Sequence, residues 1–212
     1  MSPRLLDHVA LWVSERDAIA EACIRELGMH EIERTDAFTL VGADARRGKL
    51  TLFEAEAPRE RGVLESIAFR TPGGGGGELE LPDGLVLRTV DGDDWDLDHV
   101  ALRSRDPESV TPEYERLGFR AAGPGRLQVG DAYLELPEGE PGQQQRPLLN
   151  HLGVLVDSAE EHRDEAEAAG IEIADFVDAP NTIAVFVWGP DHGSGERVKI
   201  EYVEHKPTFA LR

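Results

Sequence analysis

The chain has 212 residues, 40% of them hydrophobic and 30% charged, and its formal net charge is −20. The composition is that of a soluble globular protein with a core, and the acidic excess argues against nucleic acid or an anionic membrane as a partner, because both are recognised by lysine and arginine. The single cysteine excludes an internal disulfide, and the lack of a long apolar run or a signal-peptide core predicts a cytoplasmic protein.

The first predicted unit is a strand, a helix and three more strands. Its first strand, Leu6–Leu11, reads Leu-Asp-His-Val-Ala-Leu and carries His8. Residues 14–27 place apolar side chains on one helical stripe, and Gly28 stands where a C-terminal cap belongs. Three short β-prone segments follow, near residues 29–32, 38–41 and 50–53.

The second unit is a degenerate copy of the first. Its strand Leu64–Arg70 has Ser66 in place of the histidine. Five consecutive glycines, Gly73–Gly77, then stand where a helix is expected, and glycine opposes helix formation. Short strands are predicted at residues 78–81 and 85–88.

The third and fourth units repeat the first closely. The hexapeptide returns at Leu97–Leu102 with His99, and a looser copy at Leu149–Leu155 carries His151. A predicted helix follows each strand and ends at a glycine, 19 residues after the histidine in both units and 20 in the first. The last two strands are expected at 182–187 and 198–203. A repeat of this kind outweighs any single motif, and it predicts four copies of one unit.

Four βαβββ units with histidine on first strands and an apolar-Glu-apolar signature on last strands resemble the vicinal oxygen chelate superfamily. That superfamily includes glyoxalase I, extradiol dioxygenases, epimerases and bleomycin-resistance proteins. The resemblance covers nearly the whole chain and is weakest at residues 61–94. It implies an α+β fold of tandem modules that form two cup-shaped curved sheets. We expect residues 1–94 to pair the first two units and residues 95–212 to pair the last two.

In this superfamily, metal ligands come from the first and last strands of each unit. Carried over to this chain, the resemblance predicts the ligands His99, Glu135, His151 and Glu201 in the C-terminal domain, with the two glutamates also acting in catalysis. Two imidazoles and two carboxylates would neutralise a divalent cation (nickel, iron, manganese, cobalt or zinc) and leave positions open for substrate oxygens.

The N-terminal pair lacks this ligand set. Aligning the last strands places Thr51 at the glutamate position of the first unit. The second unit has Ser66 in place of histidine, and Val86 or Leu87 near the glutamate position. We therefore expect a structural role for His8, with a role in substrate binding as the alternative.

Three functions remain open. The leading one is a glyoxalase- or epimerase-like lyase or isomerase, in which a ligating glutamate acts as base and the metal stabilises an enediolate. The second is an extradiol ring-cleaving dioxygenase, whose iron would use His99, His151 and Glu201. The third is a metal-free binder of the bleomycin-resistance type, holding a hydrophobic or cationic molecule. Each takes a small-molecule partner, and a monomer or a homodimer fits all three.

Two residues differ from the pattern of the extradiol dioxygenases and count against that function. Ile183 and Phe186 stand at the places of its acid–base histidine and its tyrosine. His192 is nearby, but the sequence Gly189-Pro-Asp-His-Gly193 predicts an exposed turn there.

Overall fold

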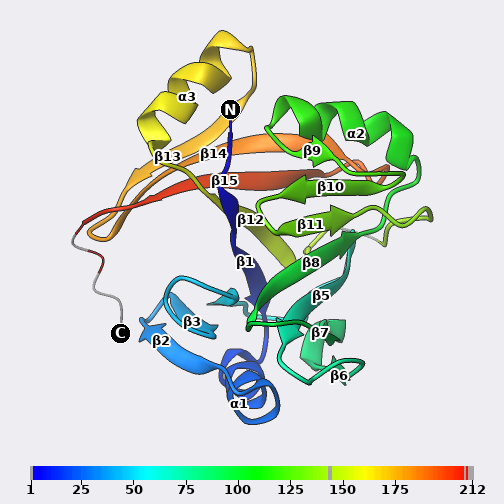
Figure 1. The fold of residues 1–212 in the computed structure, drawn as a ribbon, viewed down its shortest axis with the longest axis vertical. Helices are drawn as coiled ribbons and strands as arrows, with labels where there is room; N and C mark the ends of the chain where they lie inside the picture. The colour runs from blue at the N-terminus through cyan, green and yellow to red at the C-terminus, as the bar shows by residue number, and fades with distance from the viewer. Residues whose placement is uncertain (1, 143–144, 208, 210–212) are drawn as a thin grey trace.

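The computed structural model of the protein describes residues 2–142, 145–207 and 209. These residues form two mixed sheets of eight and seven strands, with three α-helices and one short 3-10 turn (Figure 1). The predicted fold class, α+β with tandem βαβββ units in two curved sheets, is confirmed. None of the described helices has the length and hydrophobicity that crossing a membrane requires.

The first two units follow the predicted order. The first comprises β1 (Leu5–Val13), α1 (Arg16–Leu27), β2 (His30–Arg34), β3 (Phe38–Gly42) and β4 (Lys49–Glu54). The second comprises β5 (Leu64–Thr71), β6 (Glu78–Glu80), η1 (Pro82–Gly84) and β7 (Val86–Asp91). Gly28 caps α1 in the left-handed conformation, with φ of 69°. The glycine-rich segment forms no helix, as predicted.

The last two units both keep their helix. The third comprises β8 (Asp96–Leu102), α2 (Pro107–Arg116), β9 (Arg120–Ala121), β10 (Arg126–Val129) and β11 (Ala132–Glu135). The fourth comprises β12 (Leu149–Leu155), α3 (Ala159–Ala168), β13 (Ile173–Asp178), β14 (Thr182–Asp191) and β15 (Arg197–His205). Asp106 and Ser158 cap α2 and α3, because their side chains accept hydrogen bonds from backbone N–H groups of the first turn.

The units pair differently from our expectation. One sheet has the order β13-β14-β15-β12-β1-β4-β3-β2 and joins the fourth unit to the first; the other has the order β6-β7-β5-β8-β11-β10-β9 and joins the second to the third. We call them the first cup and the second cup. The predicted division at residues 94 and 95 does not describe these sheets. Equivalent repeats do not fix their own partners. Here β1, the blue strand in Figure 1, pairs with β12 of the fourth unit.

In both cups, two first strands run antiparallel at the centre and each lies parallel to the last strand of its own unit. In the first cup, β1 pairs with β12 and β4, and β12 also pairs with β15. In the second cup, β5 pairs with β8 and β7, and β8 also pairs with β11. Side chains alternate along a strand, so corresponding positions of two units face one another across each cup.

His192 differs from the prediction of an exposed turn. Only 1% of the residue is accessible to solvent. Its Nε2 lies 2.8 Å from the hydroxyl of Tyr114 on α2, which packs against β14. Burial lowers the pKa of His192 to about 4. The histidine therefore links a helix of the third unit to a strand of the fourth, and so joins the two cups.

Candidate metal centre

Three side chains converge at the centre of the first cup. His8 Nε2 lies 2.9 Å from Glu201 Oε2, and His151 Nε2 lies 3.0 Å from the same oxygen. The two imidazole nitrogens are 3.1 Å apart. All three residues are buried. We call them the metal triad, since among the described residues they are the one group of histidine, cysteine or carboxylate side chains close enough to hold an ion.

The spacing of the triad fits one face of an octahedron. Two ligands at right angles and about 2.1 Å from one ion are about 3.0 Å apart, whereas tetrahedral ligands are about 3.4 Å apart. Glu201 Oε2 is buried and faces the Nε2 atoms of His8 and His151 at 2.9 and 3.0 Å. One carboxylate oxygen that faces two imidazole nitrogens at such distances is placed so that all three atoms can be ligands of one ion. The two imidazoles and one carboxylate therefore fit a divalent ion with open positions on its far side.

The strand register brings His8 and His151 together. His8 lies opposite Gly153, and His151 opposite Ala10, on the antiparallel pair β1–β12. A Cβ at Gly153 would lie 2.2 Å from the His8 ring. Glycine is therefore needed at this position to admit the imidazole.

A polar neighbour orients each histidine of the triad. His8 Nδ1 lies 2.9 Å from Asp7 Oδ2, and His151 Nδ1 lies 3.1 Å from Asn150 Oδ1. A hydrogen bond at Nδ1 fixes the tautomer that leaves Nε2 free for a metal. The residue that precedes each histidine in the repeated motif thus orients that histidine.

Electrostatics prepares the site for a cation. Burial opposes charge on His8, but the carboxylates of Glu201 and Asp7 outweigh burial and raise the pKa of His8 to about 9. Burial also opposes ionisation of Glu201, yet His151 and His8 hold its pKa well below the usual range. Burial lowers the pKa of His151. A proton on His8 therefore balances Glu201 until a metal ion replaces it.

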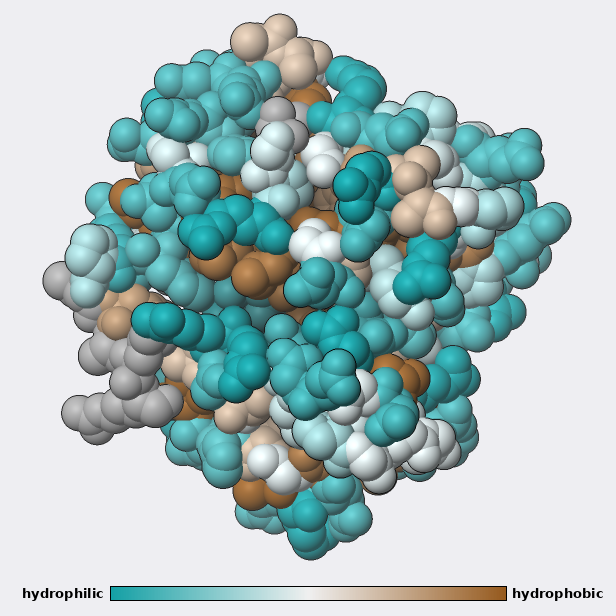
Figure 2. Space-filling model, viewed as in Figure 1, coloured by the Kyte–Doolittle hydropathy of each residue, from teal (hydrophilic) through white to brown (hydrophobic). Residues whose placement is uncertain are grey.

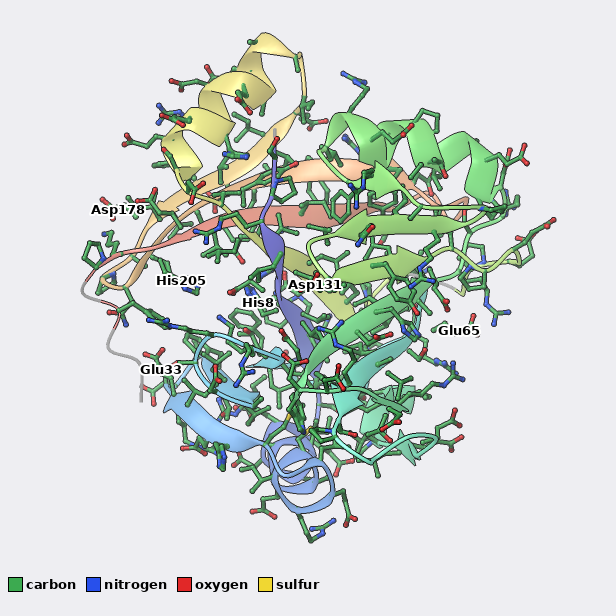
Figure 3. All side chains as sticks on the ribbon, viewed as in Figure 1. His8, Glu33, Glu65, Asp131, Asp178 and His205 are labelled. Carbon is green, nitrogen blue, oxygen red and sulfur yellow. The ribbon has the colours of Figure 1, made fainter. Side chains whose placement is uncertain are left out.

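The triad lies in a cavity of about 530 Å³. Figure 3 shows His8 and His205 in the space between the C-terminal strands and β2–β3, with Glu33 and Asp178 toward its rim. Most of the wall is apolar, including Phe38, Leu40, Phe53, Val177, Phe186 and Val203. In the space-filling view, hydrophobic residues are visible in a hollow near the centre of this face, among hydrophilic ones (Figure 2).

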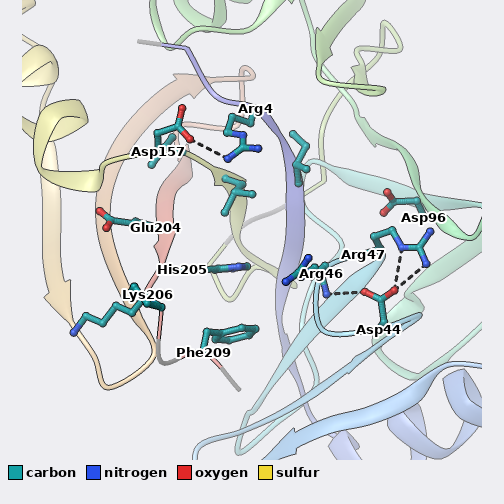
Figure 4. A pocket seen from close by; sticks show the side chains of 14 residues that line it. Arg4, Asp44, Arg46, Arg47, Asp96, Asp157, Glu204, His205, Lys206 and Phe209 are labelled. Atoms are coloured by element: carbon teal, nitrogen blue, oxygen red, sulfur yellow. Dashed lines mark hydrogen bonds and ion pairs between the residues drawn. The ribbon is translucent and has the colours of Figure 1, made fainter. Parts of the chain in front are cut away.

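A second hollow, of about 870 Å³, adjoins this cavity at His205 and Phe209. Its walls carry four basic and four acidic side chains: Arg4, Arg46, Arg47 and Lys206 with Asp44, Asp96, Asp157 and Glu204 (Figure 4). Arg4 pairs with Asp157, and Arg47 with Asp44, each at 2.9 Å. The hollow beside the cavity is thus polar and balanced in charge.

Comparison with known proteins gives matches of structure alone. No protein-family model matches the chain, and no curated protein matches it by sequence. A "putative dioxygenase" from Bacillus subtilis superposes with a TM-score of 0.73 at 14% identity, over 98% of this chain and 87% of that one. Glyoxalase I from Zea mays superposes with a TM-score of 0.68 at 16% identity, over 96% of this chain and 92% of that one. The cppA protein from Streptococcus pneumoniae superposes with a TM-score of 0.61 at 15% identity, over 96% of this chain and 100% of that one.

The chain has the vicinal oxygen chelate fold. At these identities the likeness establishes the fold and no reaction. Each cup of this chain is built from two paired units, so the corresponding strand positions of both cups can be compared directly.

The predicted ligand set is divided between the two cups. His151 and Glu201 belong to the metal triad, whereas His99 and Glu135 lie on β8 and β11 of the second cup. His8 takes the place beside His151 and Glu201 that we assigned to His99, which makes it a candidate ligand where a structural role was predicted. The symmetry argument behind the prediction holds, but the partner of the fourth unit is the first unit.

The second cup keeps only part of a metal site. His99 Nε2 is 3.7 Å from Glu135 Oε2, and the Glu135 side chain is 45% exposed, against 10% for Glu201. Asp98 Oδ2 lies 2.7 Å from His99 Nδ1. The His99 ring stacks on Tyr133 at 4.9 Å. The histidine is thus held by its neighbours without an ion.

Arg88 takes the fourth ligand position of the second cup, where Val86 or Leu87 was predicted. On the central strands, Ala68 pairs with Arg88 just as Gly153 pairs with Glu201 and Ala10 with Thr51. Arg88 Nη1 donates to Ser66 Oγ at 3.3 Å. A guanidinium keeps its charge and repels a cation from this cup.

Sequence reasoning missed three features of the first cup. The identical hexapeptides around His8 and His99 are a signal that both could bind metal, but the missing glutamate at Thr51 hid it. Gly153, where the other units have alanine, is a second signal. The third is Lys49, which lines the cavity and places its ammonium 2.7 Å from Asp7 Oδ2.

Proposed function

We propose that the protein is a metal-dependent dioxygenase that holds iron(II) through His8, His151 and Glu201 and cleaves a small ring bearing adjacent oxygens. The supporting observation is the buried triad of two imidazoles and a single carboxylate with octahedral spacing. Such a set with open positions suits non-haem iron(II) oxygenases. Iron(II) in this environment supplies the redox chemistry that activates dioxygen.

The fourth ligand position favours this function over the lyase or isomerase. That function calls for a histidine and a glutamate from both units, one glutamate serving as base. The first cup has one glutamate, and Thr51 takes the other place. The metal-free binder is also less well supported, because it gives no role to the convergence of two imidazoles and one carboxylate in a buried group.

The side chains around the triad hold the substrate and exclude water. The Phe186 ring packs edge-on against His151 at 5.2 Å, and Phe53 lies 6.5 Å from it on another strand. Apolar walls of this kind favour a flat, ring-sized substrate and keep the site dry. Asp7 and Asn150 keep the two imidazoles in the required orientation.

The test is anaerobic reconstitution with iron(II), followed by elemental analysis and oxygen uptake with catechol as probe. We expect one iron per chain and oxygen consumption matched by loss of catechol. His8→Ala should abolish both, while His99→Ala, the equivalent change in the second cup, should leave both intact. Tight nickel or zinc binding with activity on the hemithioacetal of methylglyoxal and no oxygen uptake would favour the isomerase. Absence of any bound metal would favour the binder.

A further inference from the structure

A buried ammonium in the cavity is not used by the metal triad. Lys49 is 3% exposed, and its side chain shares one face of β4 with Thr51 and Phe53, both of which line the cavity. Its Nζ lies 2.7 Å from Asp7 Oδ2, the oxygen that also faces His8 Nδ1 at 2.9 Å. The ammonium is thus separated from His8 of the triad by one carboxylate.

Asp7 does not satisfy this ammonium fully. An ammonium has three donors, and Asp7 also accepts from His8 and faces His205 Nε2 at 3.4 Å. The nearest aromatic contact of Lys49 is Phe209, with Nζ 5.9 Å from the ring centroid. Within the part of the chain that the structure describes, Lys49 has no second hydrogen-bond acceptor.

The buried charges of the cavity do not balance once a divalent ion is bound. Asp7 and Glu201 are each about nine-tenths buried or more and supply two negative charges, and Lys49 supplies one positive charge. The imidazoles are neutral as metal ligands. A divalent ion therefore leaves one excess positive charge, and an uncompensated buried charge is costly. A ligand with a single negative charge removes that excess.

The approach does not oppose such a ligand. Although the chain carries a net charge of −20, the hollow beside His205 has equal numbers of acidic and basic side chains. An anion that enters there meets no excess of negative charge.

We propose that the substrate is a monoanionic aromatic acid whose carboxylate binds Lys49 while its two adjacent oxygens face the triad. This inference rests on the proposed function and assigns Lys49 as the residue that selects the charge of the substrate. The phenylalanine-rich wall takes the ring, and the ammonium lies beyond Asp7, at the end of the cavity lined by His205.

The test compares matched acids and amides as probes. The 2,3- and 3,4-dihydroxybenzoates and their neutral amides are titrated by calorimetry into zinc-loaded protein, in which no oxidation occurs. We expect at least one acid to bind about tenfold or more tightly than its amide, as a charge-assisted contact implies. Lys49→Gln, which leaves Asp7 a hydrogen-bond donor, should remove that preference without changing the affinity for the amide.

Lys199→Gln is the matched control. Lys199 holds the equivalent position on β15, but its ammonium lies over Trp188 at 5.2 Å and not among the residues that line the cavity. The preference for the acid should survive this change. If the zinc content is one per chain and neither acid is preferred over its amide in the wild-type protein, the inference is overturned and the metal site stands. A zinc content near zero overturns both the inference and the proposed function.

Discussion

The two cups place the same four strand positions around an axis and fill them differently. The positions hold His8, Thr51, His151 and Glu201 in the first cup, and Ser66, Arg88, His99 and Glu135 in the second. The second cup folds with its histidine held by side chains and with a guanidinium near its centre. Among the described residues, the second cup therefore keeps the same strand arrangement without a group of side chains able to hold an ion. In the first cup a buried carboxylate oxygen lies within 3.0 Å of two imidazole nitrogens, and this arrangement is what distinguishes the two cups.

The largest expected effect is a difference in metal affinity between variants of Glu201 and Glu135. Glu201→Gln should lower the affinity for metal by more than the roughly 100-fold typical of losing an outer contact, because it removes the one carboxylate ligand. Glu135→Gln, at the equivalent position of the second cup, should leave the affinity unchanged. Equilibrium dialysis with elemental analysis measures both. Equal losses in the two variants would show that the cups do not differ in the way described.

The contact between the cups should depend on pH through His192. Its pKa in the folded protein, about 4, lies below the ordinary value of 6.5, so its contribution to stability is complete above pH 6.5 and is lost as pH falls toward 4. The shift corresponds to about 3 kcal/mol. Between pH 7.5 and 4.5, the free energy of unfolding measured with urea should fall less in His192→Gln than in the wild-type protein.

His30→Gln is the control for this comparison, because His30 is exposed. Its stability should follow the wild-type pH dependence. If His192→Gln follows it as well, His192 does not titrate between these limits.

A smaller loss of metal affinity is expected when one methyl group is added at Gly153. Gly153→Ala should displace the His8 imidazole, since the new Cβ would lie within 2.2 Å of it, and weaken metal binding by about 10–100-fold. Ala101 already has a Cβ at the corresponding site of the second cup, opposite Ser66. Ala101→Gly should therefore leave metal binding unchanged. Normal metal affinity in Gly153→Ala would mean that His8 has room to move.

The smallest expected effect is a gain of metal binding in the second cup. Ser66→His combined with Arg88→Thr gives the second cup the residue types of the first, and at excess metal we expect a second, weaker equivalent by elemental analysis. Ser66→His alone should stay at one equivalent, because Arg88 still repels the cation. A stoichiometry of one in the double variant would show that the exposure of Glu135, and not Arg88, prevents binding.

The sequence predicted the units and their ligand positions but not the pairing of the units. Alternation along strands is a local property, so His8, His151 and Glu201 could each be placed on an inward face from the repeat alone. Which unit meets which depends on long-range strand contacts, and four similar copies satisfy the repeat equally well in either pairing. The same limit hid Lys49, since its partner Asp7 and the cavity exist only after β1 and β4 are side by side.

The pairing of β1 with β12 has a consequence for how the protein is made. His8 and His151 are 143 residues apart in sequence, and β15, which carries Glu201, comes after the strands of the second cup. During synthesis the edge of β1 that pairs with β12 stays open until β12 has been made, although β4 can cover the other edge early. The strands of the second cup are all made before β12. Contacts between distant segments form slowly, and an unpaired strand edge invites aggregation. The three residues of the triad therefore come together only after the strands of the second cup have been made.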